Sequence, residues 1–411
     1  MAEARGPEHD VCMPARAHLR SQTVTRPHVV IAGGGVAAIE LALALDDLAG
    51  RRVRLTLIAP HVDFERRSLL TAAPFSADHG RRHPLRPLAD RVGAELIKDA
   101  VVAVDAARHL VRLADASTIA FDALVVAVGA CHNRAYSRAI TFDDHTATTA
   151  ISGLLADLEG QWTHSVAFVV PPGDTWPAPL YELALMTARA LHAMCVDDAR
   201  LQLFSPEQSP LAVFGPPASR AVADLLEAAA ITFSGNTQVL PDGDGRLRML
   251  PGDERLVAER VVALPTLEGP HLEGVPSDAR GFIPVDHHGR VLGLVDVYAA
   301  GDATDFPVKQ GGLACQQADA VAEVLAASAG ADVEPQPFRP VLRAQLLTGH
   351  GVQHLEHRLD GGDQDPLPQQ RPWAADRKID GRYLSPWLRE VHETGGVQVR
   401  AGNAVGGSRR A

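Results

Sequence analysis

A glycine-rich segment near the start of the chain carries the first residues with recognisable chemistry. Gly33, Gly35 and Ala38 have the spacing Gly-x-Gly-x-x-Ala and follow the apolar run Val29–Ala32. In such a turn the first glycine permits a tight reversal, the second lets the backbone approach a pyrophosphate, and the small third residue lets a helix pack on the strand. The helix expected from Val36 onward then offers free N–H groups to the phosphates. The spacing predicts a dinucleotide site.

One part of that site is missing from its usual place. In dinucleotide folds an acidic residue about 20 residues beyond the glycines binds the ribose 2′-hydroxyl. The next predicted strand, Val53–Ala59, is followed by Pro60 and carries no acid at its end. Asp63 and Glu65 are the carboxylates that could take over this contact.

A second segment, far along the chain, ends in a glycine and an aspartate. Val295–Ala300 reads as a buried strand that runs into Gly301 and Asp302, and Gly311–Ala322 reads as a helix lined with small residues. The string Y-A-A-G-D resembles the second FAD motif of the flavoproteins with two dinucleotide-binding domains, a group similar to disulfide reductases, type II NADH dehydrogenases and sulfide:quinone reductases. The resemblance implies that Asp302 hydrogen-bonds the ribityl chain of FAD and that the helix, which contains Gly312, directs its N-terminus at the flavin.

Further positions match the same family. Leu124–Ala130 resembles the family's strand followed by Thr-Gly, with Gly129 retained and valine in place of threonine. The resemblance implies that Val101 or Val102 offers its backbone to adenine. It also implies that Arg67 reaches the pyrophosphate or the flavin edge, although a solvated arginine on a loop is an equal alternative.

Lys309 lies between the strand end and the glycine-opened helix. At the edge of a flavin, its positive charge would favour the reduced, anionic ring. The alternative is a solvated lysine on a loop, but the position of Asp302 seven residues earlier favours the flavin edge.

A second α/β unit follows, with a predicted strand at His164–Val170 and a predicted helix at Leu180–Leu191. The connecting loop, Pro171–Pro179, holds four prolines and one glycine. Prolines lack the N–H groups that cradle phosphates. We therefore expect this domain to keep the dinucleotide-binding fold without the standard mode of NAD(P)H binding.

This loop has a resemblance of its own. Trp176–Glu182 is similar to the Cys-x-x-Pro-x-Tyr-Glu segment of sulfide:quinone reductases and flavocytochrome c sulfide dehydrogenases, and the turn at Lys309 is similar to their Pro-Lys-Thr-Gly turn. Trp176 replaces a cysteine of their sulfur relay, so the relay is expected to be absent. Cys131 and Cys315 stay candidate thiols, with buried packing as the favoured alternative. The sequence has no Cys-x-x-Cys or Cys-x4-Cys pair, which excludes a dithiol-disulfide reductase.

Glu182 is the last of the candidate catalytic residues, beside Lys309 and Cys315. It could touch a nicotinamide or relay a proton, or it could stabilise the positive end of its helix. The histidines have no metal-ligand spacing, and we expect no metal.

Composition sets the outer limits. The chain has 411 residues, 39 lysines and arginines against 50 acidic residues, and a formal net charge of −11. Its length suggests two or three domains, and its charge argues against nucleic-acid binding. No apolar stretch is long enough to span a bilayer. Four scattered cysteines and a first segment without a secretory signal favour the cytoplasm.

The end of the chain is less informative. Phe338–Leu347 resembles a strand of a small C-terminal interface domain, and Gly361–Gln370 reads as a flexible link. Trp373 and the cluster around Trp387 could cover the flavin, form a dimer or touch a membrane. Docking on the protein's own core is the favoured alternative. Residues beyond Gly395 are expected to be disordered.

The sequence therefore predicts an α/β protein with two Rossmann-like three-layer dinucleotide-binding domains, the first discontinuous, and a small C-terminal region. The expected ranges are 1–27 for a disordered extension, 28–150 and 276–330 for the FAD domain, 151–275 for the NAD(P)-binding-like domain, and 331–411 for the C-terminal region.

Three functions compete on this evidence. The first is an FAD-dependent oxidoreductase that passes two electrons from NAD(P)H or another small donor to a quinone or other small acceptor. The second is a sulfide:quinone-reductase-like enzyme without the cysteine relay, and the third is a non-catalytic flavin-binding or electron-transfer subunit. A homodimer and peripheral contact with the inner face of the membrane are compatible with all three.

Overall fold

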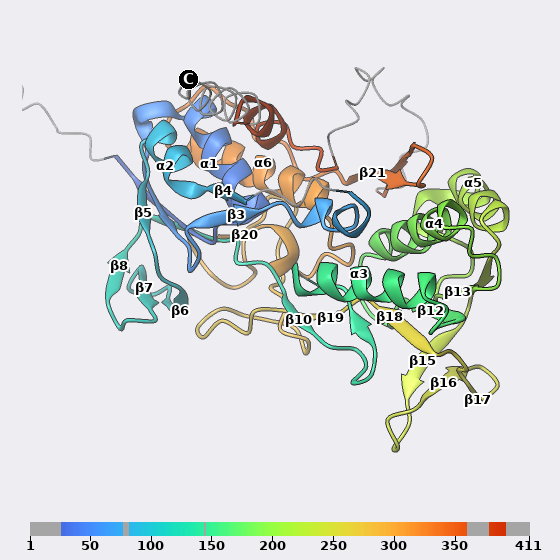
Figure 1. Ribbon diagram of the computed structural model, residues 1–411. Coiled ribbons are helices and arrows are strands. Elements are labelled where there is room, and N and C mark those ends of the chain that lie inside the picture. Colours follow the sequence, from blue (N-terminus) through green and yellow to red (C-terminus); the bar gives the residue numbers. More distant parts are fainter. Residues whose placement is uncertain (1–25, 77–81, 144, 360–377, 392–411) are drawn as a thin grey trace, which may run out of the picture.

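The computed structural model describes residues 26–76, 82–143, 145–359 and 378–391. Two α/β halves lie side by side, and the segments after helix α6 extend over both (Figure 1). The expectations for residues 1–25, the link at 361–370, Trp373 and the tail beyond Gly395 lie outside the described residues.

The first half is built on a parallel sheet with the strand order β20-β9-β1-β2-β5. Its strands are β1 (His28–Ala32), β2 (Arg54–Ile58), β5 (Glu95–Ile97), β9 (Ala123–Val126) and β20 (Val297–Ala299). Because β20 follows the whole second half in sequence and still pairs with β9, the first domain is discontinuous, as predicted.

Two helices cover one face of this sheet, and a meander covers the other. The helices α1 (Val36–Leu48) and α6 (Gly311–Ser328) pack together through alanines, which allow close approach. The opposite face carries β6 (Val101–Asp105), β7 (Leu110–Leu113) and β8 (Thr118–Ala120), which form an antiparallel meander. The first half is therefore three-layered.

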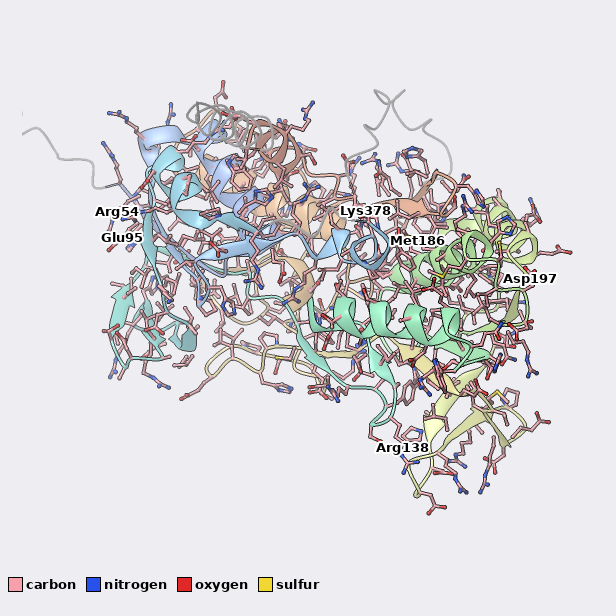
Figure 2. All side chains as sticks on the ribbon, in the orientation of Figure 1. Arg54, Glu95, Arg138, Met186, Asp197 and Lys378 are labelled. Carbon is pink, nitrogen blue, oxygen red and sulfur yellow. The ribbon has the colours of Figure 1, made fainter. Side chains whose placement is uncertain are left out.

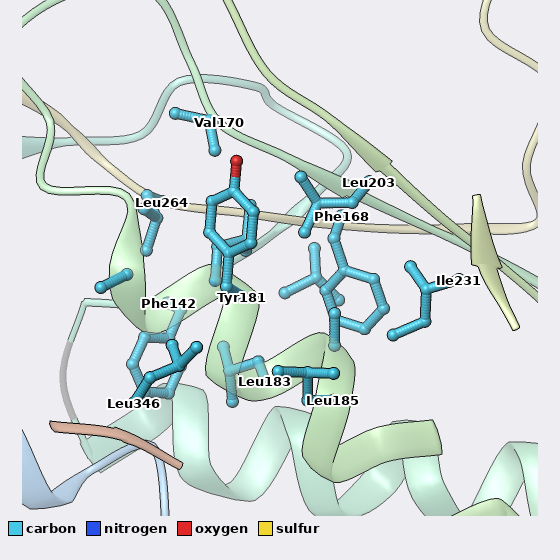
Figure 3. Packing of buried hydrophobic residues seen from close by; sticks show 14 of the residues in the cluster. Phe142, Phe168, Val170, Tyr181, Leu183, Leu185, Leu203, Ile231, Leu264 and Leu346 are labelled. Carbon is cyan, nitrogen blue, oxygen red and sulfur yellow. The ribbon is translucent and has the colours of Figure 1, made fainter. Parts of the chain in front are cut away.

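The second half repeats this plan with the strand order β11-β18-β12-β13-β14, again all parallel. The strands are β11 (Ile140–Thr141), β12 (Ser165–Val169), β13 (Arg200–Phe204), β14 (Ile231–Ser234) and β18 (Arg260–Ala263). Helices α3 (His145–Glu159), α4 (Ala178–Ala193) and α5 (Gly215–Ala228) pack on one face around Phe168 and Tyr181 (Figure 3). A meander of β15 (Gln238–Pro241), β16 (Leu247–Leu250) and β17 (Glu254–Arg255) lies on the other.

The expected domain boundary at residue 150 lies inside α3. Because β11 already belongs to the second sheet, that sheet begins before the boundary. A two-stranded ladder of β10 (Cys131–Asn133) and β19 (Thr266–Glu268) pairs the segments that lead into and out of the second half.

Short elements complete the chain. They are α2 (Leu85–Val92), the pair β3 (Asp63–Glu65) and β4 (Arg82–Pro84), the hairpin β21 (Val341–Leu347) and β22 (Val352–Arg358), and the 3-10 helices η1 (Gly50–Arg52), η2 (Arg67–Leu69), η3 (Ala73–Phe75), η4 (Ala212–Phe214) and η5 (Gly301–Ala303). The strand β21 lies within the predicted strand region at 338–347.

The last described segment, 378–391, docks on the first half. Leu384, Trp387 and Leu388 are buried in a cluster with Ile39 and Leu85 of helices α1 and α2. Their packing confirms the favoured prediction that these side chains cover the protein's own core. No helix in the described ranges is both long and apolar enough to cross a membrane.

Candidate functional site

Three of the predicted site segments meet at one edge of the first sheet. The strands β1, β9 and β20 are parallel neighbours, so their carboxyl ends lie together. Backbone hydrogen bonds continue past the strands, from Ala127 N to Ala32 O (2.8 Å) and from Ala300 N to Val126 O (3.1 Å). Gly33, Gly129 and Gly301 lie within three residues of the ends of these strands, and all three have positive φ angles.

The glycines of the first loop have different roles. A Cβ on Gly33 would lie 2.2 Å from the carbonyl oxygen of Ala127, so Gly33 is required for the loop to pack against the end of β9. Gly35 is exposed, and a Cβ there would meet no atom within 4 Å. Ala38 is fully buried between helix and sheet, and Val36 is the half-buried first residue of α1. The loop is tight where it meets protein and open where a phosphate would approach.

Helix α1 also has a suitable N-terminus. No side chain caps it, and its first turn contains no acidic residue. An uncapped helix start leaves N–H groups available to an anion and places the positive end of the helix dipole there. Together with the open side of Gly35, this arrangement fits the pyrophosphate of a dinucleotide.

Asp302 is placed by its neighbouring glycine. Gly301 has φ +79°, and a Cβ on it would lie 3.1 Å from the Cβ of Ala37 and 3.4 Å from that of Ala314, where α1 and α6 converge. The half-buried carboxylate of Asp302 accepts no hydrogen bond from any described residue. Burial raises its pKa, and the positive charges of Lys309 and Arg67 oppose the shift. A carboxylate in this state fits a hydroxyl donor such as the ribityl chain of FAD.

Lys309 is buried rather than solvated. Its Nζ donates to the carbonyl oxygen of Thr304 and lies 3.7 Å from the ring centroid of Phe282. Burial lowers the pKa of Lys309 to about 8, with Asp302 and Asp174 opposing the shift. The solvated alternative for Lys309 is therefore wrong. Lys309 brings a titratable cation to the edge that Asp302 occupies.

Arg67, the first residue of η2, is exposed but belongs to the same region. Its positive charge lowers the pKa of Asp302, and its Nη1 lies 3.5 Å from Nε2 of His132. Cys131, the neighbour of His132 on β10, is exposed. The predicted position of Arg67 beside the site is therefore compatible with both a cofactor contact and a solvated side chain.

The adenine end has one matching feature and one gap. The register of β6 against β7 shifts between Val101 and Ala103, so Val102 lies in a bulge with no ladder partner. A bulge leaves backbone groups available to another partner. At the ribose position, Glu65 forms an ion pair with Arg82 at 3.6 Å, which leaves the exposed Asp63 as the freer carboxylate.

The start of α6 is less open than that of α1. The side chain of Gln310 accepts a hydrogen bond from Leu313 N at 3.0 Å and so caps the helix from within. A Cβ on Gly312 would lie 3.0 Å from Oε1 of Gln310 and 3.6 Å from the carbonyl oxygen of Asp380. The helix that was expected to direct its N-terminus at the flavin is partly satisfied by its own chain.

Glu182 does not lie at a free catalytic position. One carboxylate oxygen accepts from Oγ1 of Thr71 (2.7 Å) and from Nζ of Lys378, and the other accepts from Leu347 N (3.0 Å). Lys378 lies between the two halves of the molecule (Figure 2). Burial lowers the pKa of Lys378, and Glu182 opposes this shift. The structure assigns Glu182 to a buried ion pair at the junction of the halves, rather than to a nicotinamide contact or to the helix dipole.

Cys315 is buried on α6 beneath the C-terminal segment. A Cβ on Gly381 would lie 2.9 Å from its Sγ and 2.8 Å from Oε2 of Glu40. Burial raises the pKa of the Cys315 thiol, and the negative charge of Glu40 adds to the shift. Because the thiolate is the reactive form, the structure supports the packing alternative for Cys315 and not the catalytic one.

The corresponding loop of the second half packs against its own chain. Trp176 of the proline-rich loop packs edge-on against Phe214, with ring centroids 5.8 Å apart. Asp174 of the same loop forms an ion pair with Arg280 at 2.7 Å, and Thr175 Oγ1 donates to Pro265 O at 3.0 Å. The loop is therefore tied to other segments through its side chains.

The acid after β13 is also engaged. Glu207 accepts hydrogen bonds from Tyr181 Oη, Ser205 Oγ and Ala212 N, at 3.0, 3.0 and 3.1 Å. Burial raises its pKa. An acid near this place usually binds the ribose of NAD. Because Glu207 is held by its own domain and the loop has four prolines in place of a glycine-rich turn, these residues fit NAD(P)H poorly.

Sequence reasoning missed the residues that join the halves, notably Lys378 and Thr71. A signal was present: the chain contains only three lysines, Lys98, Lys309 and Lys378. Two of them, Lys309 and Lys378, are buried. A compact ammonium that loses its proton readily when buried differs chemically from arginine.

No group of three or more His, Cys, Asp or Glu residues within the described residues is arranged to hold a metal ion.

Solved structures share this fold, whereas no protein-family model matches the chain. The chain is similar to the sulfide:quinone oxidoreductase of Aquifex aeolicus, at 19% identity and a TM-score of 0.70, over 81% of this chain and 87% of that one. It is also similar to a ferredoxin reductase of Rhodopseudomonas palustris (21%, TM-score 0.57, 77% and 79%) and to putidaredoxin reductase in its covalent complex with putidaredoxin (19%, TM-score 0.61, 82% and 82%). These likenesses confirm the predicted fold, an α/β protein with two Rossmann-like domains.

Proposed function

We propose that this protein is an FAD-dependent oxidoreductase that transfers two electrons from a small donor to a quinone or another small acceptor. The observation that carries the proposal is the edge formed by β1, β9 and β20. There, Gly35 opens beside the uncapped start of α1, and Asp302 presents a carboxylate that accepts no hydrogen bond from the described residues. The names of the similar structures, a quinone oxidoreductase and two reductases, support the same class.

The residues divide the binding of FAD among them. Gly33 and Gly35 would hold the pyrophosphate, Val102 would offer its backbone to adenine, and Asp302 would bind the ribityl hydroxyls. FAD would supply the electron-accepting isoalloxazine ring. Lys309 places a positive charge near Asp302 that can favour a reduced, anionic ring.

The second half of the molecule bears on the identity of the electron donor. The packing of Trp176 against Phe214 and the engaged carboxylate of Glu207 favour a donor other than NAD(P)H. This reverses the order in which the sequence-based hypothesis named the donors. Glu182, which had supported NADH chemistry, is held by Lys378.

A sulfide:quinone-reductase-like reaction is the second candidate. The segment Pro179–Glu182, the turn at Lys309 and the similar solved structure favour it. Against it, Cys315 is buried, so Cys131 is the accessible thiol near Arg67 and no second exposed cysteine lies beside it in the sequence. The third candidate, a flavin-binding subunit without its own donor, has the same cofactor site.

We also propose a cytoplasmic location, a homodimer, and peripheral contact with a membrane, where a quinone acceptor would lie. The aromatic cluster at Trp387 is not available for either contact, because it is buried on the first half.

The test is anaerobic mixing of the purified, FAD-loaded protein with NADH, NADPH or sulfide, followed at the flavin absorption band. We expect stoichiometric FAD and slow or no bleaching by either nucleotide. Rapid bleaching by NADH would overturn the argument about the donor. Bleaching by sulfide that Cys131→Ser abolishes would establish the second candidate. Protein that cannot be reconstituted with FAD would refute the cofactor itself.

A further inference from the structure

We infer that a groove on the outer face of the second sheet binds a small organic anion. The groove has a volume of about 470 Å³ and lies between the sheet and the β15–β17 meander. Its lining includes Arg200, Gln202, Phe204, Ser234, Met249 and Arg255. The helices α4 and α5 lie on the other side of this sheet (Figure 1). The groove belongs to the second sheet and the proposed FAD site to the first, so the inference is independent of the proposed function.

The residues of β13 are patterned for such a groove. Leu201 and Leu203 point into the core beneath the helices, whereas Arg200 and Gln202 alternate with them and line the groove. The meander covers the sheet around Val169 with a small apolar cluster, which leaves polar side chains of β13 and β14 outside it. A sheet face that only needed covering would place apolar residues at these positions.

The groove has more hydrogen-bond donors than acceptors. Within the described ranges, the side chains of Arg200, Gln202, Ser234 and Arg255 take part in no hydrogen bond or ion pair. Glu254 is the one carboxylate of the lining. Two guanidinium groups, an amide and a hydroxyl together select a carboxylate or phosphate, which accepts several hydrogen bonds at once.

The meander itself adds a charge imbalance. Arg255 on β17 is directly opposite Arg248 on β16. Arg248 forms an ion pair with Asp253 at 2.9 Å, but Arg255 has no such partner among the described residues. Like charges directly across a ladder are destabilising. A bound anion at Arg255 would offset this repulsion.

Apolar residues decide the rest of the ligand. Phe204, Met249 and Pro251 give the groove a partly apolar lining. Ligand sites of roughly 300–1,000 Å³ usually combine such surfaces with a few convergent polar groups. The ligand class is therefore a flat organic group that carries a carboxylate or phosphate, up to the size of a mononucleotide.

The test is isothermal titration calorimetry of the protein saturated with FAD, so that the dinucleotide site cannot take the probes. The probes are AMP, phenyl phosphate and benzoate, with adenosine and inorganic phosphate as the two halves of AMP. Arg200→Gln and Arg255→Gln remove one guanidinium each. Arg220→Gln is the matched control, because Arg220 is an exposed arginine on α5, on the helix-covered side of the sheet.

We expect at least one aromatic anion to bind, with each groove variant weakening it by about tenfold or more, as for loss of a charge-assisted hydrogen bond. Arg220→Gln should bind like the parent protein, and adenosine and phosphate should bind more weakly than AMP. The inference would be overturned if AMP, phenyl phosphate and benzoate all failed to bind at about 10 mM, a concentration on the order of the Kd of a weak site. Equal binding by Arg200→Gln and Arg220→Gln would also overturn it.

Discussion

The two halves of this protein share one architecture and differ in the loop that follows β1 in the first half and β12 in the second. Both have five parallel strands, helices on one face and a three-stranded meander on the other. After β1 the loop has Gly33 and Gly35, whereas after β12 it has the prolines of 171–179. Because the cores are formed by strand and helix side chains, the loop can lose its phosphate-binding chemistry while the fold persists.

The acid that usually binds the ribose is absent after β2 of the first half and present after β13 of the second. In the first half Ala59 occupies the strand end, beside the open glycine loop. In the second half an acid is present, Glu207, but it is held by Tyr181 and Ser205. Each half has kept one part of the dinucleotide fingerprint. A single motif therefore says less about binding than whether its polar groups are still free.

We expect the largest loss of stability when the first glycine of the loop after β1 is replaced, and a glycine of the loop after β12 serves as the comparison. Gly33→Ala places a Cβ 2.2 Å from Ala127 O at φ +131°, and overpacking with backbone strain should cost about 4 kcal/mol. Gly173→Ala in the second loop also changes a residue with positive φ (+118°), but its Cβ would meet no atom within 4 Å. Urea unfolding of the apoproteins should show a smaller loss for Gly173→Ala, about 2 kcal/mol from strain alone. Equal losses would contradict the different roles.

The junction between the halves should be nearly as sensitive. Lys378→Met leaves the buried carboxylate of Glu182 without its cation, which should cost about 3–5 kcal/mol in urea unfolding. Adding Glu182→Gln should recover more than half, because the amide oxygen can still accept from Leu347 N. The exposed pair of Arg91 and Glu390 is the control, and Arg91→Met should cost less than about 1 kcal/mol. If the double variant unfolded as easily as Lys378→Met alone, the explanation by ion pairing would be contradicted.

A smaller, pH-dependent effect is expected at Lys309, where Asp302 of the first half and Asp174 of the second act on one cation. The folded pKa, about 8, lies below the unfolded value of 10.5, so the unfolded chain binds the extra proton between these values. The Lys309 contribution to stability should rise with pH in that window, by at most about 1.4 kcal/mol per unit.

The measurement is the difference in unfolding free energy between the parent and Lys309→Met across pH 8 to 10.5. Lys98→Met, at an exposed lysine, should give a flat difference. A flat difference for Lys309→Met as well would show that Lys309 is not desolvated.

The smallest effect separates binding from folding in the first half. Gly35→Ala adds a Cβ with no protein atom within 4 Å, so the apoprotein should change by less than about 1 kcal/mol. FAD affinity should fall at least tenfold, about 1.4 kcal/mol, because the Cβ would stand where a pyrophosphate approaches. Fluorescence titration of the apoprotein with FAD measures this affinity, and an undiminished affinity would move the cofactor away from Gly35.

Much of the fold followed from local patterns. The strand before Gly33, the helix α6 after Asp302, and the strand β12 with the helix α4 were all predicted by apolar runs and periodicity. The cofactor role of Asp302 is implied by the resemblance of its segment to the second FAD motif, and it stays a prediction. The roles of Glu182 and Cys315 were not predicted, because a sequence does not show which distant side chain will neutralise a carboxylate or cover a thiol.

The sequence by itself determined the two parallel folds and the contrast between a glycine loop and a proline loop, since both depend on residue types within one short segment. Only the tertiary structure decided which polar groups stay free. Glu207 is hydrogen-bonded by Tyr181 and Ser205, and Glu182 is ion-paired with Lys378, whereas Asp302 accepts no hydrogen bond within the described chain. The physical reason is that desolvation and pairing depend on contacts between segments far apart in the chain, such as residues 71, 182 and 378.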